Sequence, residues 1–290
     1  MTGTRRISKP GATVAERIRD GMPLLTRSEK RAAQTLLANY PLQGLETAAQ
    51  FASKAGVSTP SVLRFVGRIG FASYADFQRR LKEEVEERLQ SPLAKTGADP
   101  SSAPVQPLGE AIAENVIETF RHLPPDELAA VGALLSDPRR PLHLLGGRFT
   151  DPLARYMTAH LRILRPNVSH IEGQRENWQD QLIDMGARDV LFLIDIRRYQ
   201  ADLTDFAVAA AKRRVTTILL TDQWLSPAAR VARHTLPARV SVPSAWDSNA
   251  ALLAIIEALI ADVMARRWTQ SRERMALIER LRGGETARGR

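Results

Sequence analysis

Thr47-Ala-Ala-Gln-Phe-Ala-Ser-Lys-Ala-Gly-Val-Ser-Thr-Pro-Ser-Val-Leu-Arg-Phe-Val-Gly-Arg-Ile69 decides the fold of the N-terminal part of this chain. Apolar residues recur every three or four positions on both sides of Gly56, which is the spacing of one buried face on each of two helices. They are Ala48, Phe51, Ala52 and Ala55 before the glycine and Val62, Phe65, Val66 and Ile69 after it. Glycine readily adopts the left-handed conformation that ends a helix, and Thr47 and Ser58 are suitable N-caps. The stretch therefore predicts two short helices joined by a tight turn.

The outward face of the second predicted helix has the side chains of a DNA-contacting helix. Small hydroxyl residues near a helix N-terminus allow close approach to base edges and phosphates, and arginine can make a bidentate contact with guanine. We expect Arg64 to contact a base and Arg68, one turn later, to contact phosphate. The predicted DNA contacts are Lys54, Ser58, Thr59, Pro60, Ser61, Arg64 and Arg68.

The distribution of charge supports binding to a polyanion. Residues 1–95 contain 16 Lys and Arg against 9 Asp and Glu, whereas residues 96–263 contain 17 against 20. Residues 264–290 add 8 arginines against 3 glutamates, so the net charge of +9 is concentrated at the two ends of the chain. A basic end attracts nucleic acid, although it can also be only a soluble surface.

Composition excludes several other classes of site. The 290 residues include no cysteine, which excludes disulfides, thiolate zinc sites and cysteine nucleophiles. The five histidines show no metal-ligand spacing, and no serine has an evident histidine and aspartate partner. We therefore expect no catalytic residues, no metal site and no cofactor. The most apolar predicted helix, residues 250–260, is too short to span a bilayer, and no signal peptide is recognisable, so we expect a cytoplasmic protein with no membrane partner.

Prolines mark a boundary after the helical N-terminal part. Residues 90–109 contain four prolines among serines, alanines and glycines, so this segment cannot form one helix or strand. Before it, Thr26 and Glu29 have the spacing of a capping box, and Ser73 begins a helix whose apolar side carries Phe77, Leu81, Val85 and Leu89. We expect an all-α helix-turn-helix domain at residues 1–90, a Pro-rich linker at 91–109, an effector or oligomerisation domain at 110–268 and a basic tail at 269–290.

After the linker, strand and helix patterns alternate, which is typical of a parallel sheet covered by helices on both faces. The predicted strands are residues 141–145, 168–171, 190–195, 216–221 and 235–240. Helices are expected at 111–122 and 126–136, and a closing helix at 247–268. The expectation is a doubly wound α/β domain with five parallel strands. Ligands bind at the carboxyl ends of such strands, here residues 146–150, 195–200 and 221–224.

The segment Ala55-Gly-Val-Ser-Thr-Pro-Ser-Val-Leu-Arg-Phe-Val-Gly-Arg-Ile-Gly-Phe71 resembles the helix-turn-helix of the MurR/RpiR family of bacterial transcription regulators. The resemblance covers most of the chain. It implies an N-terminal DNA-binding domain followed by a sugar isomerase (SIS) domain, and a cytoplasmic homodimer or homotetramer. It also implies double-stranded operator DNA as a partner and a carbohydrate-derived effector, such as a sugar phosphate.

The predicted effector loops depart from the pattern of this family. SIS domains typically hold a phosphosugar with a Ser-x-Ser-Gly-x-Thr loop after the third strand, where this chain has Asp195-Ile-Arg-Arg-Tyr-Gln200. The first loop, usually Gly-x-Gly-x-Ser, is Gly146-Gly-Arg-Phe-Thr150. Asp195 would repel phosphate and the arginines would occupy the space above a glycine-based cradle, so a standard phosphosugar site is not expected.

Three arginines in these loops could instead form a clamp. If Arg148, Arg197 and Arg198 converge, they could bind a carboxylate or phosphate, with Asp195 orienting one of them. The expected effector-binding residues are Gly146, Gly147, Arg148, Thr150, Asp195, Arg197, Arg198, Tyr199 and Gln200. The alternative is a closed pocket in which the arginines form ion pairs and the domain serves only oligomerisation.

We therefore expect a regulator whose operator binding is modulated by a small anionic metabolite, and not an enzyme. A sugar-phosphate isomerase is one alternative, since His160, His170, Glu172 and Glu176 are potential bases near the predicted crevice. It leaves the helix-turn-helix unexplained. An architectural DNA-binding protein without sequence preference is the other, and it leaves the ligand-type domain unexplained. Coupling between ligand and DNA requires that the DNA-binding domain be docked and not flexibly tethered.

Overall fold

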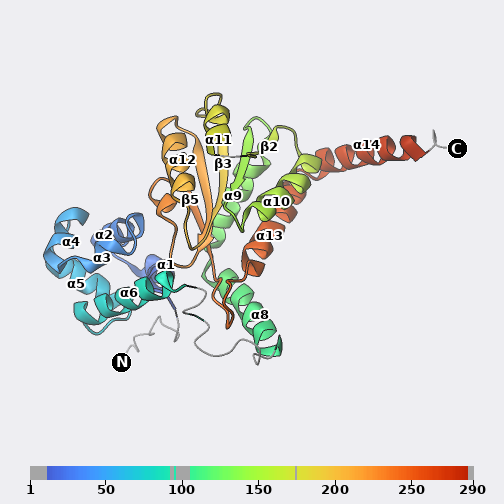
Figure 1. The fold of residues 1–290 in the computed structure, drawn as a ribbon. Helices are drawn as coiled ribbons and strands as arrows, with labels where there is room; N and C mark the ends of the chain where they lie inside the picture. Colours follow the sequence, from blue (N-terminus) through green and yellow to red (C-terminus); the bar gives the residue numbers. More distant parts are fainter. Residues whose placement is uncertain (1–11, 92–94, 96–104, 174, 287–290) are drawn as a thin grey trace.

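The structure is a computed structural model that describes residues 12–91, 95, 105–173 and 175–286. A group of helices lies beside an α/β body, and a long C-terminal helix projects from that body (Figure 1). Most of the predicted linker at 91–109 falls outside the described residues, as do residues 1–11 and 287–290. The domain limits predicted above therefore stay predictions.

The N-terminal part is entirely helical, as expected. Its elements are α1 (Val14–Gly21), η1 (Met22–Leu24), α2 (Arg27–Ala38), α3 (Leu42–Leu45), α4 (Ala48–Ala55), α5 (Thr59–Arg68) and α6 (Tyr74–Leu89). Thr26 and Glu29 form the predicted capping box, in which each side chain accepts a hydrogen bond from the other residue's backbone N–H. These reciprocal bonds satisfy amides that the first turn of a helix leaves free.

The predicted helix-turn-helix is confirmed as α4 and α5. Gly56 ends α4 with φ 60° and ψ 40°, the left-handed conformation expected of it. Thr47 caps α4 as predicted, but Ser58 does not cap α5, because its hydroxyl bonds to the hydroxyl of Ser61 at 2.9 Å. Phe51 and Phe65 pack edge to face in the core between the two helices, with ring centroids 6.4 Å apart. This packing fixes the angle at which α5 is presented.

The buried side of α6 differs from the predicted one. Phe77 and Leu81 are buried, but Leu89 is 72% exposed, and the third buried residue is Glu84. Glu84 accepts hydrogen bonds from the Val14 amide, at 2.8 Å, and from the Tyr40 hydroxyl. Burial raises the pKa of Glu84 to about 7. A carboxyl group with these donors can occupy a core position, although position 84 was not among the predicted apolar ones.

The second half is built on five parallel strands, as predicted. They are β1 (Leu142–Gly146), β2 (Val168–His170), β3 (Val190–Asp195), β4 (Thr216–Asp222) and β5 (His234–Ala238). The strand order is β2-β1-β3-β4-β5, and every neighbouring pair is parallel. The order reverses between β1 and β3, so the loops that follow these two strands diverge and leave a crevice at the carboxyl edge of the sheet.

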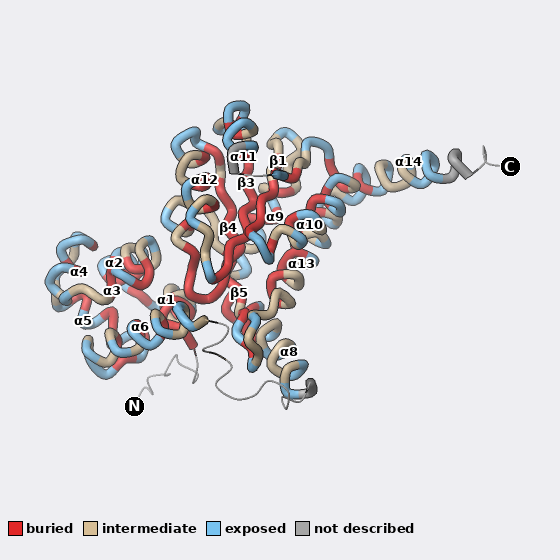
Figure 2. Tube along the Cα trace, in the orientation of Figure 1, coloured by how far each residue is buried: buried red, intermediate tan, exposed pale blue. Residues whose placement is uncertain are grey.

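Helices cover both faces of the sheet. In β3, Phe192 and Ile194 face one core cluster, while Leu191 and Leu193 face the other, which is the alternation expected of a strand buried on both sides. The first cluster includes α9 (Pro125–Ser136), α10 (Asp151–Leu164) and α13 (Ala250–Arg266), and the second includes α11 (Arg175–Leu182) and α12 (Ala201–Lys212). Figure 2 shows the strands buried between these layers.

The remaining helices extend beyond the sheet. α8 (Val105–His122) begins earlier than predicted. The closing helix predicted for residues 247–268 is confirmed as α13, which spans Ala250–Arg266, and a separate helix that was not predicted, α14 (Trp268–Thr286), follows it. Arg267, with φ −119° and ψ 27°, leaves the helical conformation and separates the two. α14 projects outward in Figure 1 and includes most of the predicted basic tail.

The helical half is docked on the α/β half through buried contacts. Leu225, in the loop after β4, belongs to the core of the helical half and is 3% exposed. Arg239 donates two hydrogen bonds to the Glu16 carboxylate, at 2.8 and 2.9 Å. His122, at the end of α8, lies 3.0 Å from the Asp20 carboxylate. These contacts join the two halves. Coupling between ligand and DNA requires a docked arrangement of this kind.

Candidate functional site

The outward face of α5 is a candidate surface for DNA. Ser58, Pro60, Arg64 and Arg68 are exposed and Thr59 is half-buried. The expected outward orientation of Ser61 is wrong, since Ser61 is only 6% exposed. Its hydroxyl instead bonds to Ser58 and accepts a hydrogen bond from the Arg64 guanidinium at 3.1 Å. Ser61 therefore supports the neighbouring side chains and does not point outward itself.

Two of the predicted cations on this surface already have acidic neighbours. Arg68 lies 3.4 Å from the Glu29 carboxylate, and Lys54 forms an ion pair with Glu46. Arg64 has no carboxylate partner within the described residues, so its guanidinium is the more available one.

Sequence reasoning missed Leu63, which is 47% exposed on the same helix. The apolar period placed it off the buried side of the helix, and an exposed leucine beside Arg64 was the available signal.

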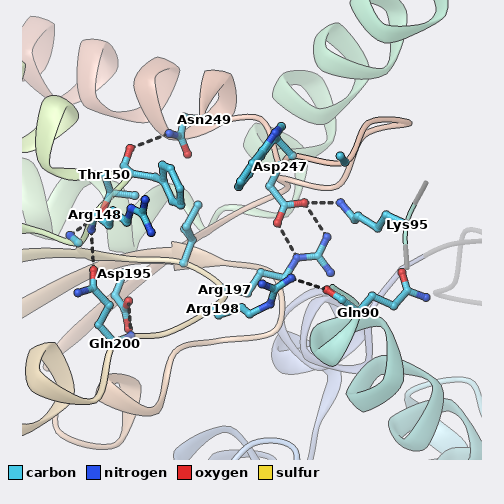
Figure 3. Close-up of a pocket in the computed structure, with 15 residues that line it drawn as sticks. Gln90, Lys95, Arg148, Thr150, Asp195, Arg197, Arg198, Gln200, Asp247 and Asn249 are labelled. Atoms are coloured by element: carbon cyan, nitrogen blue, oxygen red, sulfur yellow. Dashed lines mark hydrogen bonds and ion pairs between the residues drawn. The ribbon is translucent and has the colours of Figure 1, made fainter. Parts of the chain in front are cut away.

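A cavity of about 550 Å³ lies where the sheet order reverses, at the carboxyl ends of β1 and β3. Side chains from both loops face it (Figure 3). The lining residues are Gln90, Lys95, Gly147, Arg148, Phe149, Thr150, Asp195, Ile196, Arg197, Arg198, Gln200, Ala245, Trp246, Asp247 and Asn249. The position agrees with the rule that open α/β sheets bind ligands at such a reversal.

The loop after β1 uses its polar groups internally. The Gly147 amide donates to the Thr150 hydroxyl at 2.8 Å, and that hydroxyl donates to the Ile194 carbonyl at 2.7 Å. The Arg148 amide donates to the Gln200 side-chain oxygen at 2.6 Å. These amides therefore already have acceptors, and Thr150 and Gln200 shape the loop.

The loop after β3 is held by two buried carboxyl groups. Asp195 accepts hydrogen bonds from the Ser226 hydroxyl and from the Gln200 amide, and burial raises its pKa to about 7. Asp222 accepts hydrogen bonds from the Arg197 amide and the Tyr199 hydroxyl, both at 2.7 Å, and burial raises its pKa above the ordinary value. The carboxyl oxygens thus take donors that a phosphate would use in a backbone cradle.

Arg197 connects the cavity with the helical half. Its guanidinium makes two hydrogen bonds of 2.6 Å to the Asp247 carboxylate and one of 2.6 Å to the Glu87 carbonyl of α6. It also stacks 4.0 Å above the ring of Trp224. Lys95 contacts the same carboxylate at 2.6 Å. Burial tends to raise the pKa of Asp247, but the hydrogen bonds from Arg197 and Lys95 bring it below the ordinary value.

The three predicted arginines do line one cavity, but they differ in availability. Arg197 is buried in its ion pair, while Arg148 and Arg198 are exposed. Arg148 lies over the Phe149 ring at 5.2 Å, and Arg198 donates to the Gln90 carbonyl at 3.0 Å. The expectation that Asp195 orients an arginine is wrong, because Asp247 has that role.

Two predicted effector residues do not line the cavity. Gly146 ends β1, where a side chain would collide with the backbone of Asp151, and the Tyr199 hydroxyl is bonded to Asp222. The segment 221–224 lies beneath Arg197 and is likewise not part of the lining.

Sequence reasoning also missed several lining residues. Trp246, Asp247 and Asn249 follow β5, whose carboxyl end meets the same edge of the sheet, so the strand-end rule could have found them. Gln90 and Lys95 belong to the segment after α6 and carried no such signal.

A serine, a histidine and an aspartate line up at the opposite edge of the sheet. His143 lies 2.8 Å from the Ser169 hydroxyl and 2.8 Å from the Asp189 carboxylate. These residues stand near the amino ends of the strands, away from the cavity at the carboxyl ends. The described residues contain no cluster suited to a metal ion and no helix long and apolar enough to cross a membrane. We interpret His143 as a structural histidine with both nitrogens satisfied.

Two family models match the chain. Residues 12–88 match the helix-turn-helix domain of the rpiR family, and residues 134–262 match the SIS domain. No curated protein matches the sequence. The rpiR-family match supports a transcription regulator and favours it over an enzyme.

Solved structures share the fold. The sugar isomerase domain of an RpiR transcription factor from Sphaerobacter thermophilus has 24% identity and a TM-score of 0.57, covering 61% of this chain and 98% of that one. The NanR protein of Vibrio vulnificus, solved with ManNAc-6P, has 15% identity and a TM-score of 0.53, covering 92% of this chain and 97% of that one. A candidate sugar-phosphate isomerase from Listeria monocytogenes has 16% identity and a TM-score of 0.52, covering 60% of this chain and 93% of that one.

The likeness to the first and third of these structures spans about three fifths of this chain, whereas the likeness to NanR spans 92% of it. The chain therefore belongs to the RpiR family, with an rpiR-type helix-turn-helix domain at residues 12–88 followed by a SIS domain at residues 134–262.

Proposed function

We propose that this protein binds an operator in double-stranded DNA through α5 and that a small anion in the SIS-domain cavity modulates this binding. The observation that carries the proposal is the shared position of Arg197. Its guanidinium lines the cavity and also holds the Glu87 carbonyl of the last helix of the DNA-binding half. A ligand that changes the contacts of Arg197 therefore acts directly on the docking of that half.

The DNA contact is proposed for the outward face of α5. Arg64 is exposed and its guanidinium is steered by Ser61, a geometry suited to a bidentate contact with a guanine. Lys54 and Arg68 are proposed phosphate contacts. The ion pair of Lys54 with Glu46 is largely exposed and would exchange for phosphate at low energetic cost, because such pairs contribute little in water. Glu29 is buried, and it keeps the hydrogen bond from the Thr26 amide when Arg68 moves to a phosphate.

Modulation is proposed to work through docking. A ligand anion beside Arg197 competes with Asp247 and with the Glu87 carbonyl for the same guanidinium. Arg198 holds the Gln90 carbonyl in the same way, three residues further along the chain. Binding therefore changes the relative stability of docked and undocked states, and the DNA-binding half changes its orientation. By linkage, operator DNA must then change the affinity for the ligand by the same factor.

Paired DNA contacts require more than one copy of the chain. We propose a homodimer or homotetramer in which the SIS domains associate and set the distance between two α5 helices. A two-fold assembly of this kind binds a palindromic operator with half-sites spaced by about one helical turn of DNA.

The test is binding of the purified protein to DNA from upstream of its own gene, measured by fluorescence anisotropy and footprinting. Arg64→Ala is expected to weaken binding to a protected site by about 1–3 kcal/mol while changing binding to random DNA little. Arg79→Ala removes an exposed arginine of α6 and is the matched control. Equal losses on both DNAs would make Arg64 a phosphate contact, and no protected site at any salt concentration would contradict the proposal.

A further inference from the structure

Several backbone amides in the two cavity loops already donate to acceptors inside the protein. The amides of Gly147, Arg148 and Asp151 donate to Thr150, Gln200 and Gly147, respectively. In the second loop the Arg197 amide donates to Asp222. Pro152, in the first turn of α10, has no amide hydrogen to offer. A phosphate that approached these amides would therefore have to displace bonds already made inside the protein.

The available positive charge comes from two exposed side chains. Arg148 and Arg198 both line the cavity, and neither has a carboxylate partner within the described residues. Among the residues that the structure describes, Arg198 donates to one backbone carbonyl, that of Gln90, and Arg148 lies over an aromatic ring. The carboxyl group of Asp247 is already bonded to Arg197 and Lys95. A ligand anion thus meets forked donors on side chains that can move toward it.

Two exposed aromatic rings stand beside these cations. Phe149 is 53% exposed and Trp246 is 60% exposed, and both line the cavity. Their ring centroids are 5.4 Å apart at an angle of 58°, and Asn249 holds the Phe149 carbonyl with a hydrogen bond of 3.0 Å. Large aromatic surfaces left open at a concave site gain free energy when an apolar group covers them. A sugar with several hydroxyl groups has less apolar surface to place against these rings than an aromatic hydrocarbon ring has.

From these observations we infer that the cavity binds a small organic acid with a carboxylate attached to an apolar ring. The carboxylate contacts Arg148 and Arg198, and the ring lies against Phe149 and Trp246. This inference names the ligand class of the proposed effector site and rests on the proposed function only for its regulatory meaning. A cavity of about 550 Å³ has the volume of ordinary small-molecule sites.

The test is isothermal titration of the purified full-length protein with four probes. Phenylacetate supplies ring and carboxylate, butyrate supplies the carboxylate alone, and glucose 6-phosphate and inorganic phosphate supply the phosphate chemistry. We expect phenylacetate to bind at least tenfold more tightly than each of the other three, and to change the fluorescence of Trp246. Tighter binding of either phosphate probe, or no binding of phenylacetate at millimolar concentration, overturns the inference.

Variants locate the binding energy. Arg148→Gln and Arg198→Gln are each expected to lower the affinity for phenylacetate about tenfold, the loss of one hydrogen bond to a charged group. Trp246→Leu is expected to lower the affinity for phenylacetate but not the affinity for butyrate. Arg139→Gln removes an exposed arginine outside the cavity and serves as the control. Equal affinities in all four variants would place the ligand elsewhere and overturn the inference.

Operator binding is measured separately, so the two proposals fail in different ways. If phenylacetate binds but operator affinity stays the same, the ligand class stands and the proposed regulation fails. If a sugar phosphate binds at the cavity and changes operator affinity, the regulation stands and the ligand class is wrong.

Discussion

Arg239→Ala is expected to uncouple the two halves of the protein. The Arg239 guanidinium makes two hydrogen bonds to Glu16, whose side chain is 4% exposed, and it has no other acceptor within the described residues. Removing one partner of a buried ion pair leaves the other charge unpaired, at a cost of about 3–5 kcal/mol. Because the Arg239 side chain keeps 19% exposure, we expect about 3 kcal/mol, a large share of the stability of a single domain.

The distribution of tryptophan provides the assay. All four tryptophans, at positions 178, 224, 246 and 268, lie in the second half of the chain. Tryptophan fluorescence therefore follows unfolding of the SIS domain, while circular dichroism at 222 nm follows helices in both halves. In urea, we expect coincident transitions for the unchanged protein. For Arg239→Ala, the dichroism should begin to change at a urea concentration about 2 M lower than in the unchanged protein, given a typical urea dependence for a small domain.

Two further variants test the reasoning. Glu16→Gln in the Arg239→Ala background should recover part of the loss, because a neutral amide costs less to bury than an unpaired carboxylate and still accepts the Thr13 amide. Arg139→Ala, an exposed arginine of the SIS domain, should leave both transitions unchanged. If the two probes stay coincident in Arg239→Ala and the midpoint moves by less than about 0.3 M, the pair does not hold the halves together.

Three other predictions concern single positions. Gly56→Ala should destabilise the protein by about 1–2 kcal/mol in urea denaturation, since φ is positive there, whereas Gly67→Ala, in a helix with open space around it, should not destabilise it. The folded-state pKa of Asp195 lies at about 7, above its ordinary value of 3.8, so its contribution to stability should decline as pH rises between these values. Asp195→Asn should flatten this decline in urea midpoints measured from pH 4 to 8, and an unchanged slope would contradict the assignment. Leu63→Ala should weaken operator binding by about 1 kcal/mol through loss of an apolar contact with a thymine methyl, with an unchanged urea midpoint; unaltered affinity would remove Leu63 from the DNA surface.

Much of the fold follows from local patterns in the sequence. The period of apolar residues located α4 and α5, and the buried runs located all five strands to within about two residues. Local capping signals at Thr26, Thr47 and Ser73 were also sufficient, because a cap involves only neighbouring residues. The predicted cap at Ser58 failed for a local reason, because its hydroxyl bonds to Ser61. Other predictions failed where a distant partner decided the outcome. Glu84 is buried because Val14 of α1 and Tyr40, in the turn after α2, supply donors, which no local pattern shows.

The candidate cavity was predictable only in part, for the same reason. The strand-end rule located Arg148 and Arg197, whose loops follow neighbouring strands. Asp195 was expected to orient one of the three arginines, yet the carboxylate that binds Arg197 is Asp247, fifty residues away. Gln90 and Lys95 contribute because the helical half is docked beside the SIS domain, and docking depends on surfaces that form only after both halves have folded.

Docking through Leu225 limits how this protein can be divided or recombined. A fragment that ends near residue 90 would lack this leucine and would leave a gap in the apolar core of the helical half. It would also expose Glu16 without Arg239. A chimera that transfers this DNA-binding half to another SIS domain should therefore carry the turn at 222–226 with it, so that the recipient supplies the missing apolar contact.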